Sequence, residues 1–319
     1  MSEEILDDEN HRVKKNSMLF DKRMAKTQMW HFLILTCLPI PLTIIAFIWF
    51  PPTISNLIEF FILWFLTLSA VICGSHRFLS HKSYVPVKWL KQLLVILASM
   101  GGQGPPVVWA AFHRRHHQLT DKDGDPHTPT LSDSNLKGIF HAGFSWMKKH
   151  EYPNLMVYAP DLVRDDEIMS VNRHYYRWVF LSMLIPALIE FAVTQKPIGL
   201  LTGFLWGWAV RSFVVSSTIG YVNSFNHLLG KREFKTRDNS RNHWWMTIIT
   251  LGESFHNNHH AFPGSAHVGL KARNLDIGYG LIKCWEKLGW VSKVQVPTQQ
   301  RIESKKIEGL KENLDVESY

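Results

Sequence analysis

Two copies of one histidine pattern are the residues in this chain best suited to chemistry. The stretch "HRRHH" contains His113, His116 and His117, and "HNNHH" contains His256, His259 and His260. A spacing of i, i+3, i+4 places the three imidazoles of each group on one face of a helix. Because neutral imidazole is the commonest metal ligand in proteins, the repeated pattern predicts a metal site.

Two further groups extend this pattern. The stretch "HRFLSH" contains His76 and His81, and "NSFNH" contains Asn223 and His227. Asn223 and His227 share a helical face, but five residues separate His76 from His81, which is poor for one face of a regular helix. We expect the helix to unwind there, or the two rings to reach one site from different directions. Nine histidines without a nearby cysteine favour iron, copper, zinc or nickel, and their number predicts two ions.

Four apolar stretches must position these groups. A helix needs about 20 apolar residues to cross the hydrocarbon core of a bilayer. Membrane-spanning helices are therefore expected at residues 30–50, 54–75, 177–195 and 198–221. Short links, "PPT" and "TQKP", join them into two hairpins, so that all four histidine groups lie on one side of the membrane. Lys and Arg are concentrated outside these links, which places both termini and the metal site in the cytoplasm.

The predicted fold class is an all-α integral membrane protein with a cytosolic helical cap. We expect a cytosolic segment at residues 1–29, a membrane domain at 30–295 and a cytosolic tail at 296–319. Residues 89–109 are apolar enough for a fifth span, but a crossing would separate "HRFLSH" from "HRRHH". They are expected to form a helix along the membrane surface or inside the protein, ended by "GGQGPP". The net charge of +8 fits contact with anionic lipid or an acidic partner.

Over roughly residues 30 to 290, the chain resembles the integral-membrane fatty acid desaturases of the acyl-CoA, delta-9 type. The motifs HxxxxH, HxxHH, NxxxH and HxxHH occur in the order of that family, and "DKDGDPHTP" follows the second of them. The stretches "DNSRNHWW" and "LGESFHNNHHAFP" are more similar to the bacterial and cyanobacterial branch than to the animal enzymes.

The resemblance implies four membrane helices below a cytosolic cap that holds a di-iron centre. The nine histidines named above would bind two iron ions, with Asn223 linked through water, and no other catalytic residue is expected. With O2 as cosubstrate and two external electrons, such a centre converts two adjacent methylenes into a double bond. Second-shell carboxylates should orient the imidazoles. The candidates are Asp121, Asp123, Asp125 and Glu253.

The resemblance also predicts a buried apolar tunnel for the acyl chain. Trp64 and Leu68 would close its far end, and Trp109 is a further expected substrate contact. Trp64 and Leu68 are bulkier than the Tyr and Ala of stearoyl-type animal enzymes, which suggests a shorter tunnel and a shorter acyl chain. Both residues are also ordinary for a membrane helix that packs or faces lipid.

Departures from the family leave the acyl carrier open. Ala111 and Phe112 stand where animal enzymes place an Arg-Asp pair that holds CoA. Lys148 and Lys149 correspond to a following Arg-Lys pair and could meet phosphate. The carrier could therefore be CoA, an acyl carrier protein or a glycerolipid. The haem motif HPGG does not occur in the sequence, so the expected electron donor is a separate protein of the ferredoxin or cytochrome b5 type with its reductase. A nucleic-acid partner is not expected.

Three other functions are compatible with part of this pattern. A hydroxylase, acetylenase or conjugase would use the same scaffold and differ only in how the substrate lies at the irons. A metal transporter or sensor would place its ligands near the middle of the bilayer, often with carboxylates. Here the histidines lie at the ends of the spans, and Glu59 and Glu190 have no nearby histidine in sequence. A protein stabilised by structural zinc would not explain two metal sites.

Overall fold

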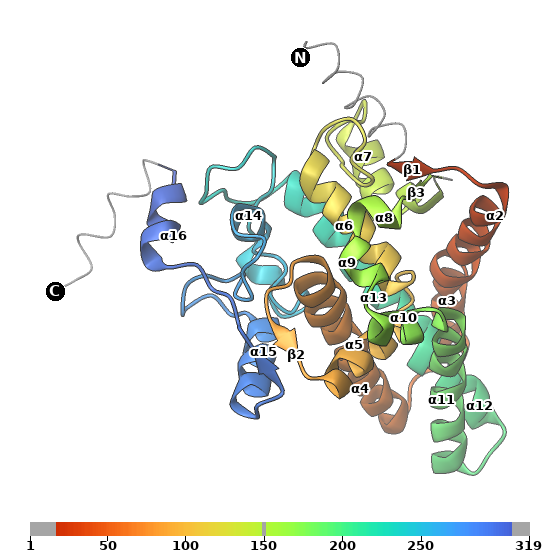
Figure 1. Ribbon diagram of the computed structural model, residues 1–319. Helices are drawn as coiled ribbons and strands as arrows, with labels where there is room; N and C mark the ends of the chain where they lie inside the picture. Colours follow the sequence, from red (N-terminus) through yellow and green to blue (C-terminus); the bar gives the residue numbers. More distant parts are fainter. Residues whose placement is uncertain (1–16, 149–150, 308–319) are drawn as a thin grey trace.

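The computed structural model describes residues 17–148 and 151–307 of the 319-residue chain. The described residues are mostly helical, as the sequence predicted. Their strands have two residues each and form two small antiparallel pairs. The pairs are β1 (Met18–Leu19) with β3 (Tyr152–Pro153), and β2 (Val85–Pro86) with β4 (Val291–Ser292). Each pair joins segments that are distant in the sequence, and Figure 1 shows β1 beside β3.

Four helical stretches are long and apolar enough to cross a membrane: Lys22–Trp49, Ile54–Ser80, Tyr175–Thr194 and Ile198–His227. The first combines α2 (Lys22–His31), the π-helix η1 (Phe32–Cys37) and α3 (Pro39–Trp49). The second combines α4 (Ile54–Ser69) with the π-helix η2 (Ala70–Ser80), and the third is α11 (Tyr175–Thr194). The fourth combines α12 (Ile198–Gly203), the π-helix η4 (Phe204–Val210), α13 (Arg211–Ser224) and the 3-10 turn η5 (Phe225–His227). The chain is thus a multi-pass membrane protein with two helical hairpins.

The second span ends in a π-helix that brings His76 and His81 together. The backbone N–H of His81 donates to the carbonyl of His76 at 3.2 Å, an i to i+5 hydrogen bond. This pattern is the repeat of a π-helix, in which residues five apart lie one above the other. The two ring centroids are 4.9 Å apart. The helix therefore widens instead of unwinding, and both rings reach one site from the same helix.

The apolar stretch at 89–109 is not one of the four candidate spans, in agreement with the sequence prediction. It forms α5 (Lys88–Met100) and the start of α6 (Pro106–Leu119), separated by "GGQGPP". Gly102 and Gly104 have φ angles of 73° and 101°, which favour glycine and end α5. Buried side chains of α5, including Leu94 and Ala98, pack into one core with Ile72 of η2. A buried α5 keeps the histidines of α6 on the same side as those of η2.

The remaining helices form the cap around the ends of the spans. They are α7 (Asn135–Gly143), η3 (Ser145–Lys148), α8 (Leu155–Tyr158), α9 (Pro160–Val163), α10 (Asp166–Asn172), η6 (Trp244–Met246), α14 (His256–Ala261), α15 (Ile277–Lys287) and α16 (Gln299–Lys305). In Figure 1, α14 and α16 lie at the upper left, and the hairpin of α11 and α12 lies at the lower right.

A buried arginine fastens the cap to the second span. Arg77, which is 1% exposed, donates to Glu253 at 3.0 and 2.9 Å and to Asp276 at 2.9 Å. Asp276 in turn caps α15 by accepting from the backbone N–H of Tyr279 at 2.9 Å. A buried charge is tolerated only when it is paired and hydrogen-bonded in this way. The network fixes the neighbouring His76 relative to the segment that carries α14.

Candidate metal centre

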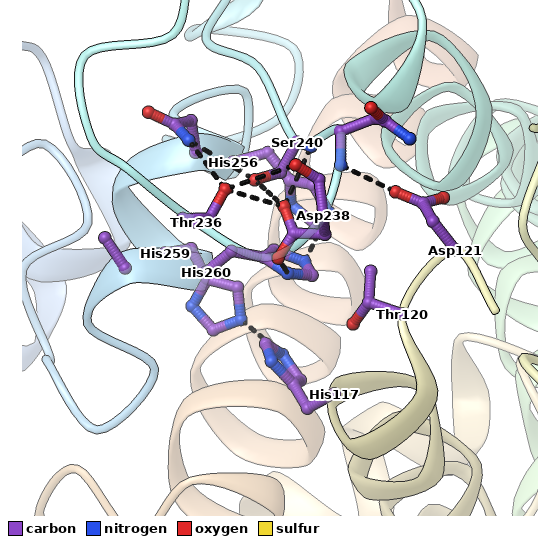
Figure 2. A network of polar contacts seen from close by, with 12 residues as sticks. His117, Thr120, Asp121, Thr236, Asp238, Ser240, His256, His259 and His260 are labelled. Carbon is purple, nitrogen blue, oxygen red and sulfur yellow. Dashed lines mark hydrogen bonds and ion pairs between the residues drawn. The ribbon is translucent and has the colours of Figure 1, made fainter. Parts of the chain in front are cut away.

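The fold gathers all nine motif histidines into two clusters. Cluster A contains His76, His81, His113, His117 and His259, and cluster B contains His116, His227, His256 and His260. Within each cluster, the nitrogens available for a metal lie within 4.8 Å of one another. Figure 2 shows part of this region, with His117 and His259 of cluster A close to His256 and His260 of cluster B. Residues from four separate stretches of the sequence therefore meet at one place.

The Nε2 atoms of cluster A converge on a common centre. His117 Nε2 lies 3.0 Å from His113 Nε2 and 2.8 Å from His259 Nε2. The Nε2 atoms of His76 and His259 are 3.0 Å apart, and those of His81 and His113 are 2.8 Å apart. Ligands at right angles around an ion, each about 2.1 Å away, would be about 3.0 Å apart. Because one ring nitrogen has one proton at most to share, a central cation satisfies these facing nitrogens better than hydrogen bonds do.

Cluster B shows the same arrangement with four rings. His256 Nε2 lies 3.0 Å from the Nε2 atoms of both His227 and His260. His116 Nε2 is buried and has no hydrogen-bond partner among the described residues. A buried nitrogen without a partner is costly unless a ligand occupies it. The donor set of cluster B therefore fits a metal ion.

The clusters divide each HxxHH motif between two sites. Of the histidines in α6, His113 and His117 belong to cluster A and His116 belongs to cluster B. Successive residues of an α-helix are rotated by about 100° around its axis. Position i+4 is therefore displaced by about 40° from position i in one direction, and position i+3 by about 60° in the opposite direction. The motif at α14 is divided in the same way, with the roles of the clusters exchanged. Each helix thus contributes histidines to both clusters.

Carboxylates hold the outer nitrogens of several rings. His116 Nδ1 donates to Asp125 at 2.9 Å, and His227 Nδ1 donates to Asp121 at 3.2 Å. His76 Nδ1 lies 3.0 Å from Glu253. Such a contact fixes the ring so that Nε2 presents its lone pair to the metal. Three of the four carboxylates expected from the sequence are therefore in contact with a ring, whereas Asp123 is exposed and forms no hydrogen bond to a histidine in the described ranges.

A fourth supporting carboxylate, Asp238, was not identified from the sequence. Its side chain accepts from His260 Nδ1 at 3.1 Å and from the hydroxyl of Ser240 at 2.5 Å (Figure 2). Asp238 precedes α14 by 18 positions, and its stretch "DNSRNHWW" differs little from an ordinary polar loop. Only the folded loop places this carboxylate behind a ligand.

Burial and charge set the protonation of the site. Burial, together with neighbouring imidazoles, holds the pKa values of several cluster histidines well below 6.5. They are His81, His113, His117, His256 and His259. Burial raises the pKa of Glu253, but His76 and Arg77 outweigh this effect and lower the pKa to about 2. These five rings are therefore neutral and the Glu253 carboxylate is ionised, which is the state that binds a cation.

A small apolar cavity of about 30 Å³ adjoins both clusters. Its lining combines histidines of both clusters with Asn223, Trp109 and apolar side chains such as Val71, Ile72 and Ile219. The Trp109 ring stacks on His113 with centroids 5.0 Å apart. The cavity therefore brings apolar side chains directly against the predicted metal ligands.

The two residues expected to close the tunnel lie in the packed core beyond this cavity. Leu68 is 0% exposed and belongs to the same core as Val71 and Ile72, and Trp64 packs against that core. A second cavity, of about 40 Å³, shares Trp109 with the first. Its lining includes Gln28, Gln103, Phe112, Trp146 and Tyr152. The two cavities therefore share Trp109 as a wall, and Leu68 is not among the residues that line either of them.

The structure describes one of the two lysines that were expected to meet phosphate. Lys148 is exposed, and its Nζ lies 5.4 Å from the centroid of the Phe32 ring. Lys149 lies outside the described residues. Lys148 lies two residues after Trp146, which lines the second cavity.

Comparisons with known proteins give a consistent result. The family model described as "Fatty acid desaturase" matches residues 55–273, which include all nine histidines. The chain is 41% identical over 305 residues to the hex-5-enoyl-[acyl-carrier protein] acetylenase of Moorena producens (strain JHB), covering 93% of this chain and 95% of the relative. It is 34% identical to the delta-9 desaturase-like 5 protein of Arabidopsis thaliana, covering 75% and 76%. It is 33% identical to the sn-2 palmitoyl-lipid 9-desaturase of Nostoc sp. (strain 36), covering 73% and 79%.

Proposed function

The chain belongs to the fatty acid desaturase family, and from this premise we propose that it removes two hydrogens from adjacent carbons of a fatty acyl chain at two iron ions. It is an oxidoreductase that acts on fatty acyl chains. The observation that carries the specific proposal is the pair of histidine clusters at the wall of one apolar cavity. For each carbon–carbon double bond formed, the reaction consumes one O2, two electrons and two protons, and it releases two waters.

Iron is the metal proposed for both clusters. Imidazole also suits zinc and copper, but zinc has no redox chemistry and cannot take part in a reaction that reduces O2. Cluster A would hold one ion, and cluster B would hold the other with Asn223 linked through water. When bound, the two irons supply the oxidising power that breaking a methylene C–H bond requires.

The chain's own residues position the substrate and exclude water. The apolar lining of the cavity, with Val71, Ile72 and Ile219, suits an acyl chain and offers few hydrogen bonds to water. Trp109 lines both cavities and stacks on His113. Its ring would therefore limit how closely the acyl chain approaches the two clusters. We expect the electrons to come from a separate donor protein and both termini to lie in the cytoplasm.

The proposed substrate is a short acyl chain on an acyl carrier protein. Leu68 is fully buried in the core that includes two residues of the cavity wall, Val71 and Ile72, and Ala111 and Phe112 lack the charges that hold CoA in the animal enzymes. The Moorena relative is a hex-5-enoyl-[acyl-carrier protein] acetylenase, and the two chains align over nearly their whole lengths. This relative also supports a second candidate function, in which the two hydrogens are removed from an existing double bond to give a triple bond.

Expression in a host without a desaturase tests the proposal. Wild type and a His256→Ala variant would be compared by mass spectrometry of acyl thioesters and lipids. A product two hydrogens lighter than a saturated chain, absent in the variant, is expected for a desaturase. Loss of two hydrogens only from an enoyl chain would identify an acetylenase, and a product one oxygen heavier would contradict both functions. Analysis of bound metal would show whether iron is present.

Chain length is tested by a Leu68→Ala variant. Removing this side chain opens space beyond the cavity, so the preferred acyl chain should lengthen by about two carbons. Leu66→Ala is the matched control, because Leu66 lies on the same helix and is 41% exposed. An unchanged chain-length profile in Leu68→Ala would show that Leu68 does not close the tunnel.

A further inference from the structure

A basic loop covers cluster B on its outer side. Residues 231–241 read "KREFKTRDNSR" and include five cationic side chains: Lys231, Arg232, Lys235, Arg237 and Arg241. The two acidic residues of the loop are already engaged. Glu233 forms an ion pair with Lys271, and Asp238 accepts from His260. The positive charge of the loop is therefore not neutralised by its own carboxylates.

The helix α16 adds to this charge. The backbone N–H of Lys235 donates to the carbonyl of Lys305 at 3.1 Å, and Phe234 packs with Ile302 in one apolar cluster. We define the basic surface as Lys231, Lys235, Arg237 and Arg301, which are all exposed. Within residues 17–148 and 151–307, these four side chains form no ion pair with a carboxylate. They are free to meet an acidic partner.

The basic surface is linked to cluster B by a short and rigid route. Asp238 lies next to Arg237, its side chain is 10% exposed, and it accepts from the ligand His260 at 3.1 Å (Figure 2). The loop is held in place by Asn257 of α14, whose side-chain oxygen accepts from the backbone N–H groups of Glu233 and Phe234 at 2.8 Å each. One carboxylate and one imidazole therefore separate solvent from the predicted metal position.

The position of the loop argues against the acyl carrier as its partner. In Figure 1 the loop lies beside α14 and α16 at the upper left, whereas the hairpin of α11 and α12 lies at the lower right. The second cavity, where an acyl chain would enter, is lined by α2, α6 and η3 and not by this loop. The basic surface is thus separate from the expected position of the acyl carrier.

We propose that the basic surface docks an acidic one-electron carrier protein, which delivers electrons to cluster B through Asp238 and His260. This inference rests on the proposed function only because the proposed reaction requires electrons from outside the protein. Desaturation of one bond with one O2 consumes two electrons, so two reduced carriers dock in turn and each leaves oxidised by one electron. Opposite charges steer such encounters and set their dependence on salt.

Binding of a plant-type [2Fe–2S] ferredoxin to the full-length holoprotein in nanodiscs tests the proposal. The variant Lys235→Glu/Arg237→Glu reverses two charges of the basic surface. We expect its Kd for ferredoxin to rise at least about tenfold at low salt, with a flatter salt dependence. The control Lys287→Glu/Lys293→Glu makes the same charge change at exposed positions outside the loop and should leave the Kd unchanged. If the first variant does not fold, Lys235→Gln/Arg237→Gln should show the same trend.

A second readout follows reduction of the bound metal without substrate. Reduced ferredoxin should reduce the iron of the loop variant more slowly than that of wild type, whereas reduced lumiflavin, which carries little charge, should reduce both equally. Equal ferredoxin binding by wild type and variant, or equal weakening in the control, would overturn the proposal. So would a variant that loses affinity for acyl carrier protein or for phosphatidylglycerol vesicles and keeps it for ferredoxin. If no acyl chain is desaturated, the proposed function fails, but ferredoxin binding still decides the role of the surface.

Discussion

Clusters A and B share the same helices but differ in their ligands and in what lies behind them. Cluster A contains five imidazoles, and a carboxylate contacts the outer nitrogen of one of them, His76. Cluster B contains four imidazoles, and three of them rest on carboxylates: His116 on Asp125, His227 on Asp121 and His260 on Asp238. Asn223, which lines the cavity beside cluster B, could add a ligand through water.

This difference suggests unequal roles for the two ions. Five imidazoles nearly complete the coordination of one ion, so cluster A leaves little room for other ligands. Cluster B would leave more positions open, and its three carboxylates would offset the charge of a bound ion. A carboxylate behind an imidazole also makes the ring a stronger donor. We therefore expect the ion of cluster B to exchange ligands and charge more readily than that of cluster A.

The largest expected effect comes from removing one ligand in each cluster. His256→Ala leaves three histidines in cluster B, whereas His81→Ala leaves four in cluster A. His256→Ala should reduce bound iron from about two ions per chain to about one and abolish product, while His81→Ala should keep more of its iron. Metal analysis of purified protein measures this difference. Equal iron loss in the two variants would contradict the proposed inequality of the clusters.

A smaller effect is expected from the carboxylates behind the rings. Asp238→Asn keeps the shape of the side chain but weakens its hold on His260. The affinity for the second iron should fall about 10- to 100-fold, with little effect on the folding of the metal-free protein. Glu253→Gln should also lower the melting temperature, because it removes a charge that pairs with buried Arg77. Iron titration and thermal unfolding of both variants would distinguish a metal effect from a structural one.

Chelation should separate the two ions kinetically. Treatment with a chelator should remove iron in two phases, with the ion of cluster B leaving first because it has fewer protein ligands. Asp238→Asn should accelerate the fast phase and leave the slow phase unchanged. Absorbance of the released iron complex follows both phases. A single phase, or acceleration of the slow phase, would mean that the two clusters hold their ions as one unit.

The smallest expected effect concerns hydroxyls that orient the carboxylates of cluster B. Ser240 donates to Asp238 at 2.5 Å, and Thr128 donates to Asp121 at 2.6 Å. Ser240→Ala and Thr128→Val each remove one hydrogen bond worth about 1 kcal/mol, so each should weaken iron binding only a few-fold. Thr120→Val is a control, because the Thr120 hydroxyl donates to the carbonyl of His116 and not to a carboxylate. Titration with iron should show a smaller loss of iron affinity for the control than for either of the two variants.

The sequence alone was sufficient to predict the fold class and the convergence of the four histidine motifs. Spans about 20 residues long are fixed by the thickness of the bilayer, which is a local requirement on composition. The short links then determine that the motifs meet on one side. In the same way, "GGQGPP" ends α5 through local backbone preferences at Gly102 and Gly104. Each of these predictions depends on residues that are close together in the chain.

Other features were decided only by the tertiary structure. The spacing of HxxHH puts three rings on one face, but the packing of α6 against η2 and α14 assigns His116 to one cluster and His113 to the other. The π-helix at Ala70–Ser80 brings His76 and His81 together, although an α-helix would separate them. Asp238 reaches His260 only because Asn257 anchors the loop. These outcomes depend on contacts between segments that are far apart in the sequence. A local pattern of residues does not determine which of these contacts are the most stable.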